Sequence, residues 1–142
     1  IDETLIQDAI TTKTKALLAV HYAGISCDMT LLRAIAQKYN LVLIEDVAHA
    51  ILAYDKSGNP VGSVGDFSTF SFHETKNLSA GEAGVLFVNK KKYIKKAEIV
   101  SAKGTNRQSF LRKETKNYEW VVPAAQLRAN LPHILRDRQT RA

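Results

Sequence analysis

Cysteine, proline and long apolar runs are all scarce in this sequence. Its 142 residues hold one cysteine, Cys27, and three prolines. A lone cysteine excludes an internal disulfide and a zinc site built from cysteines, so we expect no metal centre and a reducing, cytoplasmic setting. Because no apolar run approaches the roughly 20 residues of a membrane-spanning helix, we also expect no membrane segment.

The start of the chain lacks the usual features of a protein start. It reads Ile1-Asp2-Glu3-Thr4, which is neither an initiator methionine nor the basic head of a signal peptide, and this suggests that upstream sequence is missing. The hydrophobic content of 45% is that of a globular protein. A chain of this length buries about two thirds of its unfolded surface if it folds as one domain.

Positive charge is concentrated in the second part of the chain. Residues 1–89 hold 6 Lys+Arg against 10 Asp+Glu, whereas residues 90–142 hold 14 against 4. A nucleic-acid-binding tail is one interpretation, since clustered lysines displace counterions from a phosphate backbone. We favour a solvated helix face and no nucleic-acid partner, because apolar residues recur at helical spacing among these lysines and no nucleic-acid-binding motif accompanies them.

Three stretches predict a strand, a helix and a second strand. Residues 16–20 and 41–46 are short apolar runs of the kind that form buried strands. Between them, apolar side chains recur over residues 31–39 at the spacing of an amphipathic helix, which Asp28 or Thr30 would cap. A strand–helix–strand unit is right-handed and makes its two strands parallel, so the sequence predicts an α/β fold.

Two further strands follow this unit. Residues 67–72 mix aromatic and hydroxyl side chains and should form a strand that is buried on both faces. Residues 85–89 should pair with them in the antiparallel sense, because the connection is too short for a helical crossover. We therefore expect a mostly parallel sheet with one antiparallel strand, an inner position for residues 41–46, and a short helix over residues 2–10.

A carboxylate and a lysine fall at the predicted carboxyl edge of this sheet, where ligands bind in open α/β folds. Asp46 ends the second strand, and Lys76 lies in the polar loop after the third. Pyridoxal phosphate (PLP) chemistry uses such a pair, because the amine bonds to the cofactor and the carboxylate keeps its pyridine nitrogen protonated. An ordinary solvated lysine in a salt bridge is the alternative. His21 ends the first strand at the same edge and is either structural or in contact with substrate.

Several short motifs occur in an order that resembles the DegT/StrS family of PLP-dependent sugar-nucleotide aminotransferases. They are Glu45-Asp46-Val47-Ala48-His49, Gly65-Asp66, Phe70-Ser71-Phe72-His73-Glu74-Thr75-Lys76-Asn77 and Gly81-Glu82. Two upstream motifs look most like the members that convert dTDP-4-oxo-6-deoxy-D-glucose to dTDP-4-amino-4,6-dideoxygalactose, and they are His21-Tyr22-Ala23-Gly24 and Cys27-Asp28-Met29. Ala83 departs from the family pattern, which usually has glycine there.

The resemblance implies a role for four residues. Lys76 would form the Schiff base with pyridoxal 5'-phosphate, and Asp46 would contact the pyridine nitrogen. His49 would lie near the phenolic oxygen of the ring, and Ser71 would bind the phosphate. The implied reaction moves an amino group from glutamate to a dTDP-linked keto-sugar, for lipopolysaccharide or surface polysaccharide biosynthesis, in a cytoplasmic homodimer.

The resemblance also predicts how the chain is divided. Residues 1–120 would be a fragment of the PLP-binding large domain of a type I aminotransferase, and residues 121–142 a divergent or truncated tail. Family members hold the cofactor with a phosphate-binding helix start and a ring-stacking aromatic residue, and neither is recognisable in this chain. The second hypothesis is therefore a catalytically inactive fragment that acts only as a folded or self-associating α/β module.

Overall fold

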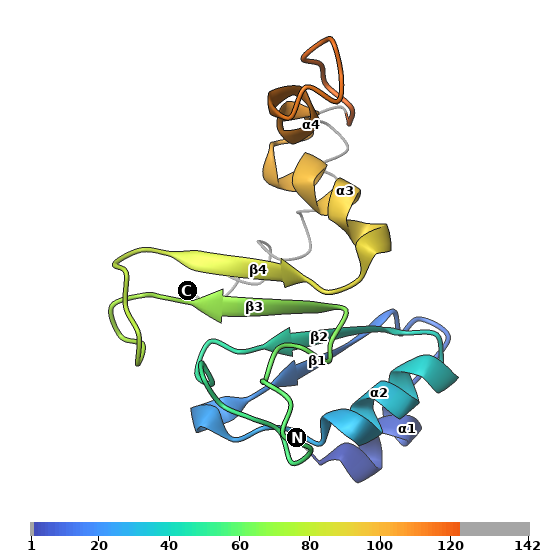
Figure 1. Cartoon of the computed structure of the whole chain (residues 1–142). Coiled ribbons are helices and arrows are strands. Elements are labelled where there is room, and N and C mark those ends of the chain that lie inside the picture. The colour runs from blue at the N-terminus through green and yellow to red at the C-terminus, as the bar shows by residue number, and fades with distance from the viewer. Residues whose placement is uncertain (1, 123–142) are drawn as a thin grey trace, which may run out of the picture. The chain divides into compact units, whose positions relative to one another are not determined.

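The structure, a computed structural model, describes residues 2–122. The chain divides into two compact units, Ile1–Lys90 and Lys91–Ala142. The first unit holds a sheet with helices on one of its faces, and the described part of the second is helical (Figure 1). The expected division after residue 120 lies at the end of the described residues and stays a prediction.

The four strands of the first unit lie in chain order in one sheet. β1 (Ala16–Val20) pairs parallel with β2 (Val42–Asp46), and β2 pairs parallel with β3 (Phe67–Ser71). β3 pairs antiparallel with β4 (Gly84–Val88). These pairings confirm the mostly parallel α/β sheet with one antiparallel strand, and β2 has the expected inner position.

Short helices precede and connect the strands. The 3-10 helix η1 (Glu3–Leu5) and α1 (Ile6–Ala9) together form the helical segment expected at residues 2–10. A second 3-10 helix, η2 (Tyr22–Gly24), follows β1, and α2 (Met29–Lys38) is the crossover helix to β2. Of the two predicted caps, Asp28 is the one used, because its side chain accepts a hydrogen bond from the Leu31 amide at 3.0 Å.

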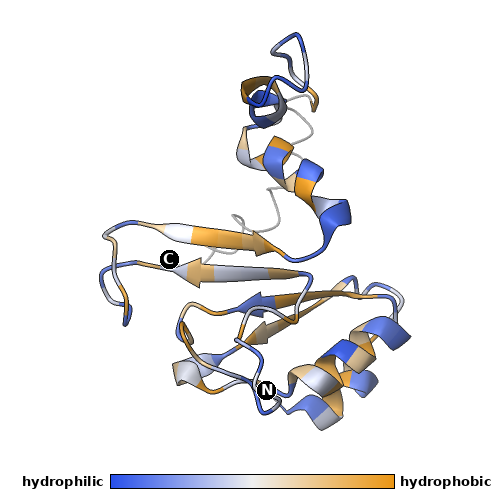
Figure 2. Ribbon diagram, in the orientation of Figure 1, coloured by the Kyte–Doolittle hydropathy of each residue, from blue (hydrophilic) through white to orange (hydrophobic). Residues whose placement is uncertain are grey.

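The main core of the first unit lies between its helices and one face of the sheet. Figure 2 shows hydrophobic residues concentrated on the strands and on part of α2, while the loop after β3 is largely hydrophilic. The buried members of this core come from α1, α2, β1 and β2, and they are Ile6, Ala19, Met29, Leu32, Ile35, Ala36 and Leu43.

The opposite face of the sheet is open at several positions. On β1, Leu18 is 56% exposed and Val20 is 46% exposed. On β3, Thr69 is exposed, whereas the neighbouring Ser68 is completely buried. The expectations that the first strand is buried and that the third is buried on both faces are therefore wrong, because side chains alternate between the two faces of a strand and α1 and α2 pack on the same one.

The described part of the second unit contains the predicted lysine-rich helix. α3 (Lys91–Ser101) is followed by α4 (Arg107–Leu111). Arg112 links this region by ion pairs to Glu98 at 2.8 Å and to Glu114 at 2.7 Å. None of the helices formed by residues 2–122 is long and apolar enough to cross a membrane.

Candidate functional site at the carboxyl edge of the sheet

Four predicted site residues lie at one edge of the sheet. Asp46 is the last residue of β2, and Ser71 is the last residue of β3. Because these neighbouring strands are parallel, their carboxyl ends share an edge. His49 follows three residues after Asp46, and Lys76 lies in the loop of residues 72–83 after β3. The assignment of these residues to one cofactor site stays a prediction.

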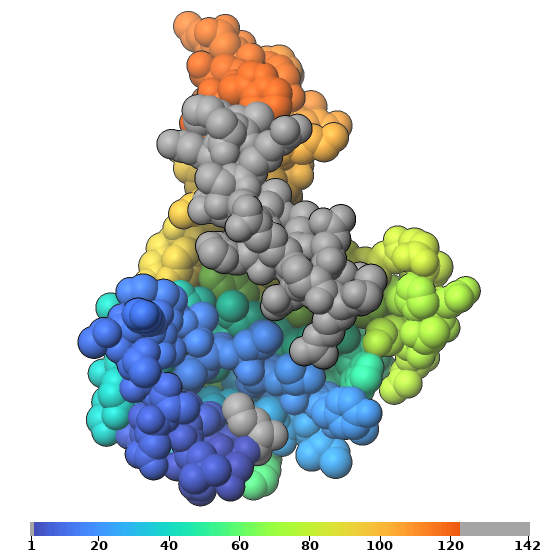
Figure 3. Space-filling model, turned by 180° about the vertical axis from the view of Figure 1, so that it is seen from behind, coloured from blue at the N-terminus to red at the C-terminus, as the bar shows by residue number. Residues whose placement is uncertain are grey.

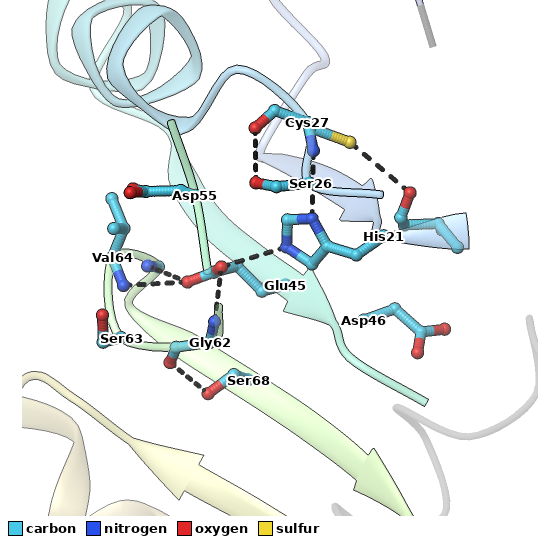
Figure 4. A network of polar contacts seen from close by, with 12 residues as sticks. His21, Ser26, Cys27, Glu45, Asp46, Asp55, Gly62, Ser63, Val64 and Ser68 are labelled. Carbon is cyan, nitrogen blue, oxygen red and sulfur yellow. Dashed lines mark hydrogen bonds and ion pairs between the residues drawn. The ribbon is translucent and has the colours of Figure 1, made fainter. Parts of the chain in front are cut away.

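Only one of the two carboxylate oxygens of Asp46 has a hydrogen-bond partner among the described residues. Its Oδ1 accepts a hydrogen bond from the Ala48 amide at 3.0 Å, while Oδ2 makes no hydrogen bond to any residue in the described range 2–122. The side chain is half-buried, and Figure 4 shows it pointing away from the neighbouring Glu45. A carboxylate with one fixed and one open oxygen is well suited to accept a hydrogen bond from a protonated ring nitrogen.

Lys76 is half-buried, and its amine has no partner within residues 2–122. The loop that carries it projects beyond the sheet in Figure 1 and stands out from the body of the first unit in Figure 3, in lime green. Its backbone amide donates to the His73 carbonyl at 2.9 Å, but its side chain has no hydrogen bond or ion pair within residues 2–122. The salt-bridge alternative therefore has no partner among the described carboxylates.

The loop around Lys76 is braced by the His73 ring. Its Nδ1 lies 2.9 Å from the Thr75 hydroxyl, and its Nε2 lies 3.4 Å from a carboxylate oxygen of Glu82. These contacts join the two sides of the loop, so the segment that holds Lys76 has a defined local shape. Ser71 Oγ accepts a long hydrogen bond of 3.4 Å from the His73 amide, and among residues 2–122 its hydroxyl donates to no acceptor.

His49 and Tyr22 add two rings to the same edge. His49 is exposed in the turn after β2, and its ring centroid lies 5.4 Å from that of Tyr22 at an angle of 53°. Tyr22 begins η2 directly after β1 and is 71% exposed. The sequence places Tyr22 at this edge without assigning it a role, and its contact with His49 is visible only in three dimensions.

Glu45 is the residue that sequence reasoning missed. It is completely buried and accepts four hydrogen bonds on its two oxygens (Figure 4). The donors are His21 Nε2 at 3.0 Å, the Gly62 amide at 2.8 Å, the Val64 amide at 3.0 Å and the Gly65 amide. Burial raises the pKa of the Glu45 carboxyl, but the hydrogen bonds from His21, Gly65 and Gly62 outweigh it and hold the pKa below its ordinary value.

His21 is a structural residue in this arrangement. It is completely buried, its Nε2 faces Glu45, and its Nδ1 accepts the Cys27 amide at 3.1 Å. Both ring nitrogens are therefore occupied within the protein, which favours the structural alternative over contact with substrate. The signal available in the sequence was the acidic pair Glu45-Asp46, of which only Asp46 received a role.

The four side chains at the edge fit the groups of PLP. The Lys76 amine complements an aldehyde, the open Asp46 oxygen a protonated pyridine nitrogen, and the Ser71 hydroxyl a phosphate. The exposed His49 ring adds a polar group that could lie near the phenolic oxygen of the cofactor. No set of three or more His, Cys, Asp or Glu side chains suitable for a metal ion occurs within the described residues.

The known proteins that this sequence resembles point to one family of aminotransferases. The sequence matches the model of the DegT/DnrJ/EryC1/StrS aminotransferase family over residues 1–138. It is 41% identical over 107 residues to the uncharacterized protein MJ1066 of Methanocaldococcus jannaschii. The matched region covers 75% of this chain and 28% of MJ1066. It is 38% identical over 112 residues to the spore coat polysaccharide biosynthesis protein SpsC of Bacillus subtilis, covering 79% of this chain and 28% of SpsC.

Solved structures of sugar aminotransferases share the fold. PseC of Helicobacter pylori, an aminotransferase of pseudoaminic acid biosynthesis, superposes with a TM-score of 0.72 at 27% identity, over 84% of this chain and 30% of PseC. DesI in the presence of its TDP-sugar product gives 0.69 at 32% identity, over 77% of this chain and 28% of DesI. The PLP form of the putative sugar aminotransferase Spr1654 of Streptococcus pneumoniae gives 0.65 at 30% identity, over 97% and 40%.

Proposed function

Because the chain belongs to the DegT/DnrJ/EryC1/StrS aminotransferase family, we propose that it supplies the cofactor-binding part of a PLP-dependent sugar aminotransferase. The observation that carries this proposal is that Asp46 and Ser71 end two adjacent parallel strands, with Lys76 in the loop that follows the second. Within residues 2–122 the Lys76 amine and one Asp46 oxygen make no hydrogen bond or ion pair. The chain spans 28% of the length of the two curated relatives described above. The proposed activity is therefore that of a full-length family member, to which this chain would contribute the cofactor-binding part.

Each residue has a distinct task in the proposed site. PLP, when bound, supplies an electron sink for bond breaking next to the amino group. Lys76 would hold the cofactor by condensation of its amine with the aldehyde, with loss of water. Asp46 would keep the ring nitrogen protonated through its open oxygen, and Ser71 would donate its hydroxyl proton to the phosphate. The exposed His49, held against Tyr22, would lie beside the ring's phenolic oxygen.

The proposed substrate is a dTDP-linked 4-oxo-6-deoxyhexose, with glutamate as amino donor. Its support is the resemblance of the motifs at residues 21–24 and 27–29, together with one similar structure that contains a TDP-sugar product. We place the reaction in the cytoplasm, consistent with a single cysteine, and expect a homo-oligomer. We propose no nucleic-acid partner, because the basic residues after residue 89 are accompanied by no nucleic-acid-binding motif.

A second candidate function is a folded module that self-associates without turnover. The observation that favours it is the exposure of the apolar side chains Leu18 and Val20 on β1. The two candidates differ in one measurable property, which is whether PLP attaches to Lys76.

The proposal is tested by incubating the full chain with PLP, reducing with borohydride and mapping the modified lysine. We expect a visible absorption band and a single adduct on Lys76. Lys76→Ala should abolish both, whereas the control Lys56→Ala, in an exposed loop of the same unit, should retain them. Labelling spread over the lysines of residues 90–96 instead would indicate nonspecific reaction and would count against the site.

A further inference from the structure

We propose that Glu45 and His21 are positioning residues for Asp46, the carboxylate assigned to the pyridine nitrogen. The inference rests on the proposed function for its catalytic meaning, but its structural content can be tested without cofactor. Neither Glu45 nor His21 would touch PLP, since both are completely buried and bonded to each other at 3.0 Å.

Glu45 and Asp46 are linked mechanically through the backbone of β2. They are consecutive residues of β2, so their side chains lie on opposite faces of the sheet. Figure 4 shows the Glu45 carboxylate inside the hydrogen-bond network and Asp46 directed away from it. Any rotation of β2 about its axis moves both side chains. The four hydrogen bonds that fix Glu45 therefore also fix the direction in which Asp46 points.

His21 contacts both Glu45 and Asp46. Its ring donates from Nε2 to Glu45, because Nδ1 is occupied as the acceptor of the Cys27 amide. Its own backbone amide donates to the Asp46 carbonyl at 3.1 Å. One residue at the end of β1 thus fixes the side chain of Glu45 and the backbone of Asp46 at the end of β2.

The Glu45 carboxylate is also connected to β3, the strand that precedes the Lys76 loop. Gly62 and Gly65 donate their amides to Glu45 in the loop that leads directly into β3. A Cβ at Gly65 would lie 3.0 Å from Glu45 Oε1 and 2.8 Å from the Phe67 carbonyl, so the close approach requires glycine. Ser68 Oγ also donates to the Gly62 carbonyl at 2.6 Å. The Glu45 network therefore sets β2 relative to β3, and with it Asp46 relative to the Lys76 loop.

Two amide substitutions separate the two bonds of the His21 ring. In His21→Gln the side-chain amide reaches the position of Nε2 and keeps a donor for Glu45, but the acceptor for Cys27 is lost. In His21→Asn the shorter side chain keeps an acceptor near the position of Nδ1, and Glu45 loses its donor. Both variants bury a neutral amide, so they are matched for polarity. If His21→Asn does not fold, Glu45→Gln provides a second way to weaken the network.

The cofactor-free test is amide hydrogen exchange on the full chain. His21→Asn should exchange about tenfold faster than His21→Gln at Gly62, Val64 and Gly65, the size expected for one lost hydrogen bond to a charged group. The decisive amide is Ala48, which reports on the Asp46 side chain through its bond to Oδ1. It should follow the other three, while the Ile35 amide in α2 stays unchanged. An Ala48 amide that is equally protected in both variants would overturn the inference, and so would a uniform rise that includes Ile35.

The test with PLP adds a readout that a purely structural role would not change. We expect PLP binding to be about tenfold weaker in His21→Asn than in His21→Gln. The pH midpoint of the bound-cofactor absorption band should also be displaced, because it reports the proton on the nitrogen that joins Lys76 to the cofactor, and the acidity of that proton depends on the charge at the ring nitrogen. Equal midpoints in the two variants would contradict the inference. If the unmodified chain does not take up PLP, the proposed function fails for this chain, and the exchange comparison alone decides the positioning role.

Discussion

The open oxygen of Asp46 is the group whose chemistry is easiest to isolate. Asp46→Asn removes its charge but keeps a side chain that can still accept the Ala48 amide. A hydrogen bond to a charged group contributes about 1.5–3 kcal/mol, so we expect PLP to bind the variant at least about tenfold more weakly while the covalent adduct on Lys76 still forms. Absorbance titration measures this, with Asp8→Asn on α1 as the control. Unchanged affinity would remove Asp46 from the site.

Glu45 predicts a specific dependence of stability on pH. Its folded-state pKa lies below the ordinary value of 4.5, so the unfolded chain binds the proton more readily than the folded one. The stabilisation by Glu45 is therefore complete above about pH 4.5 and is lost as the pH falls through the folded-state pKa. The difference in unfolding free energy between the protein and Glu45→Gln should shrink as the pH is lowered from 6 to about 3. Urea titrations test this, and a difference that stays constant contradicts it.

The sequence predicted the positions of Asp46 and Lys76 better than it predicted the residues around them. Asp46 and Lys76 were predicted at the carboxyl edge because strand ends can be located from apolar runs. Glu45 was missed because its importance depends on His21 and on the amides of residues 62–65, which are far from it in sequence. Pattern reading assigns a carboxylate in a strand to solvent or to catalysis, and only the three-dimensional contacts identify it as a buried acceptor of four hydrogen bonds.

At the scale of elements, α2 depends on one capping residue. Asp28 accepts the Leu31 amide at 3.0 Å and also donates its own amide to Glu3 at 3.0 Å. Asp28→Ala should lower the unfolding free energy by about 1 kcal/mol, whereas Asp28→Asn, which also caps well, should cost only a few tenths. Thermal or urea unfolding compares the two. Equal losses would mean that the charge of Asp28, rather than its capping geometry, stabilises the helix.

The bounds of the strands were predictable, but their burial was not. β1 covers the predicted residues 16–20, and the other three strands begin and end within one residue of their predicted positions. A short apolar run indicates a strand without telling how many of its faces are covered. Leu18 and Val20 are exposed because α1 and α2 pack on the other face, and this is a property of the assembly of elements rather than of the run itself.

At the scale of the whole molecule, the first unit has two open strand edges. Within the described residues, β1 pairs only with β2, and β4 pairs only with β3. The apolar side chains Leu18, Val20 and Leu86 are exposed on its strands, Leu86 by 52%. Unpaired backbone groups beside exposed apolar side chains favour pairing with another chain.

We therefore predict that the chain self-associates in solution. We also predict that the chain by itself has little or no transaminase activity, because the phosphate-binding helix start and the ring-stacking aromatic residue of the family are not recognisable in it. Sedimentation velocity should show a dimer or larger species that dissociates on dilution. Leu18→Lys and Val20→Lys place a charge on the exposed face of β1 and should shift the population toward monomer, because a buried interface would have to desolvate that charge. Leu52→Lys is the control, because it adds the same charge at a loop residue that is 85% exposed. A monomer at every concentration contradicts the open-edge argument, whereas full turnover with glutamate and a dTDP-4-oxo sugar would contradict the expectation that this chain alone is inactive.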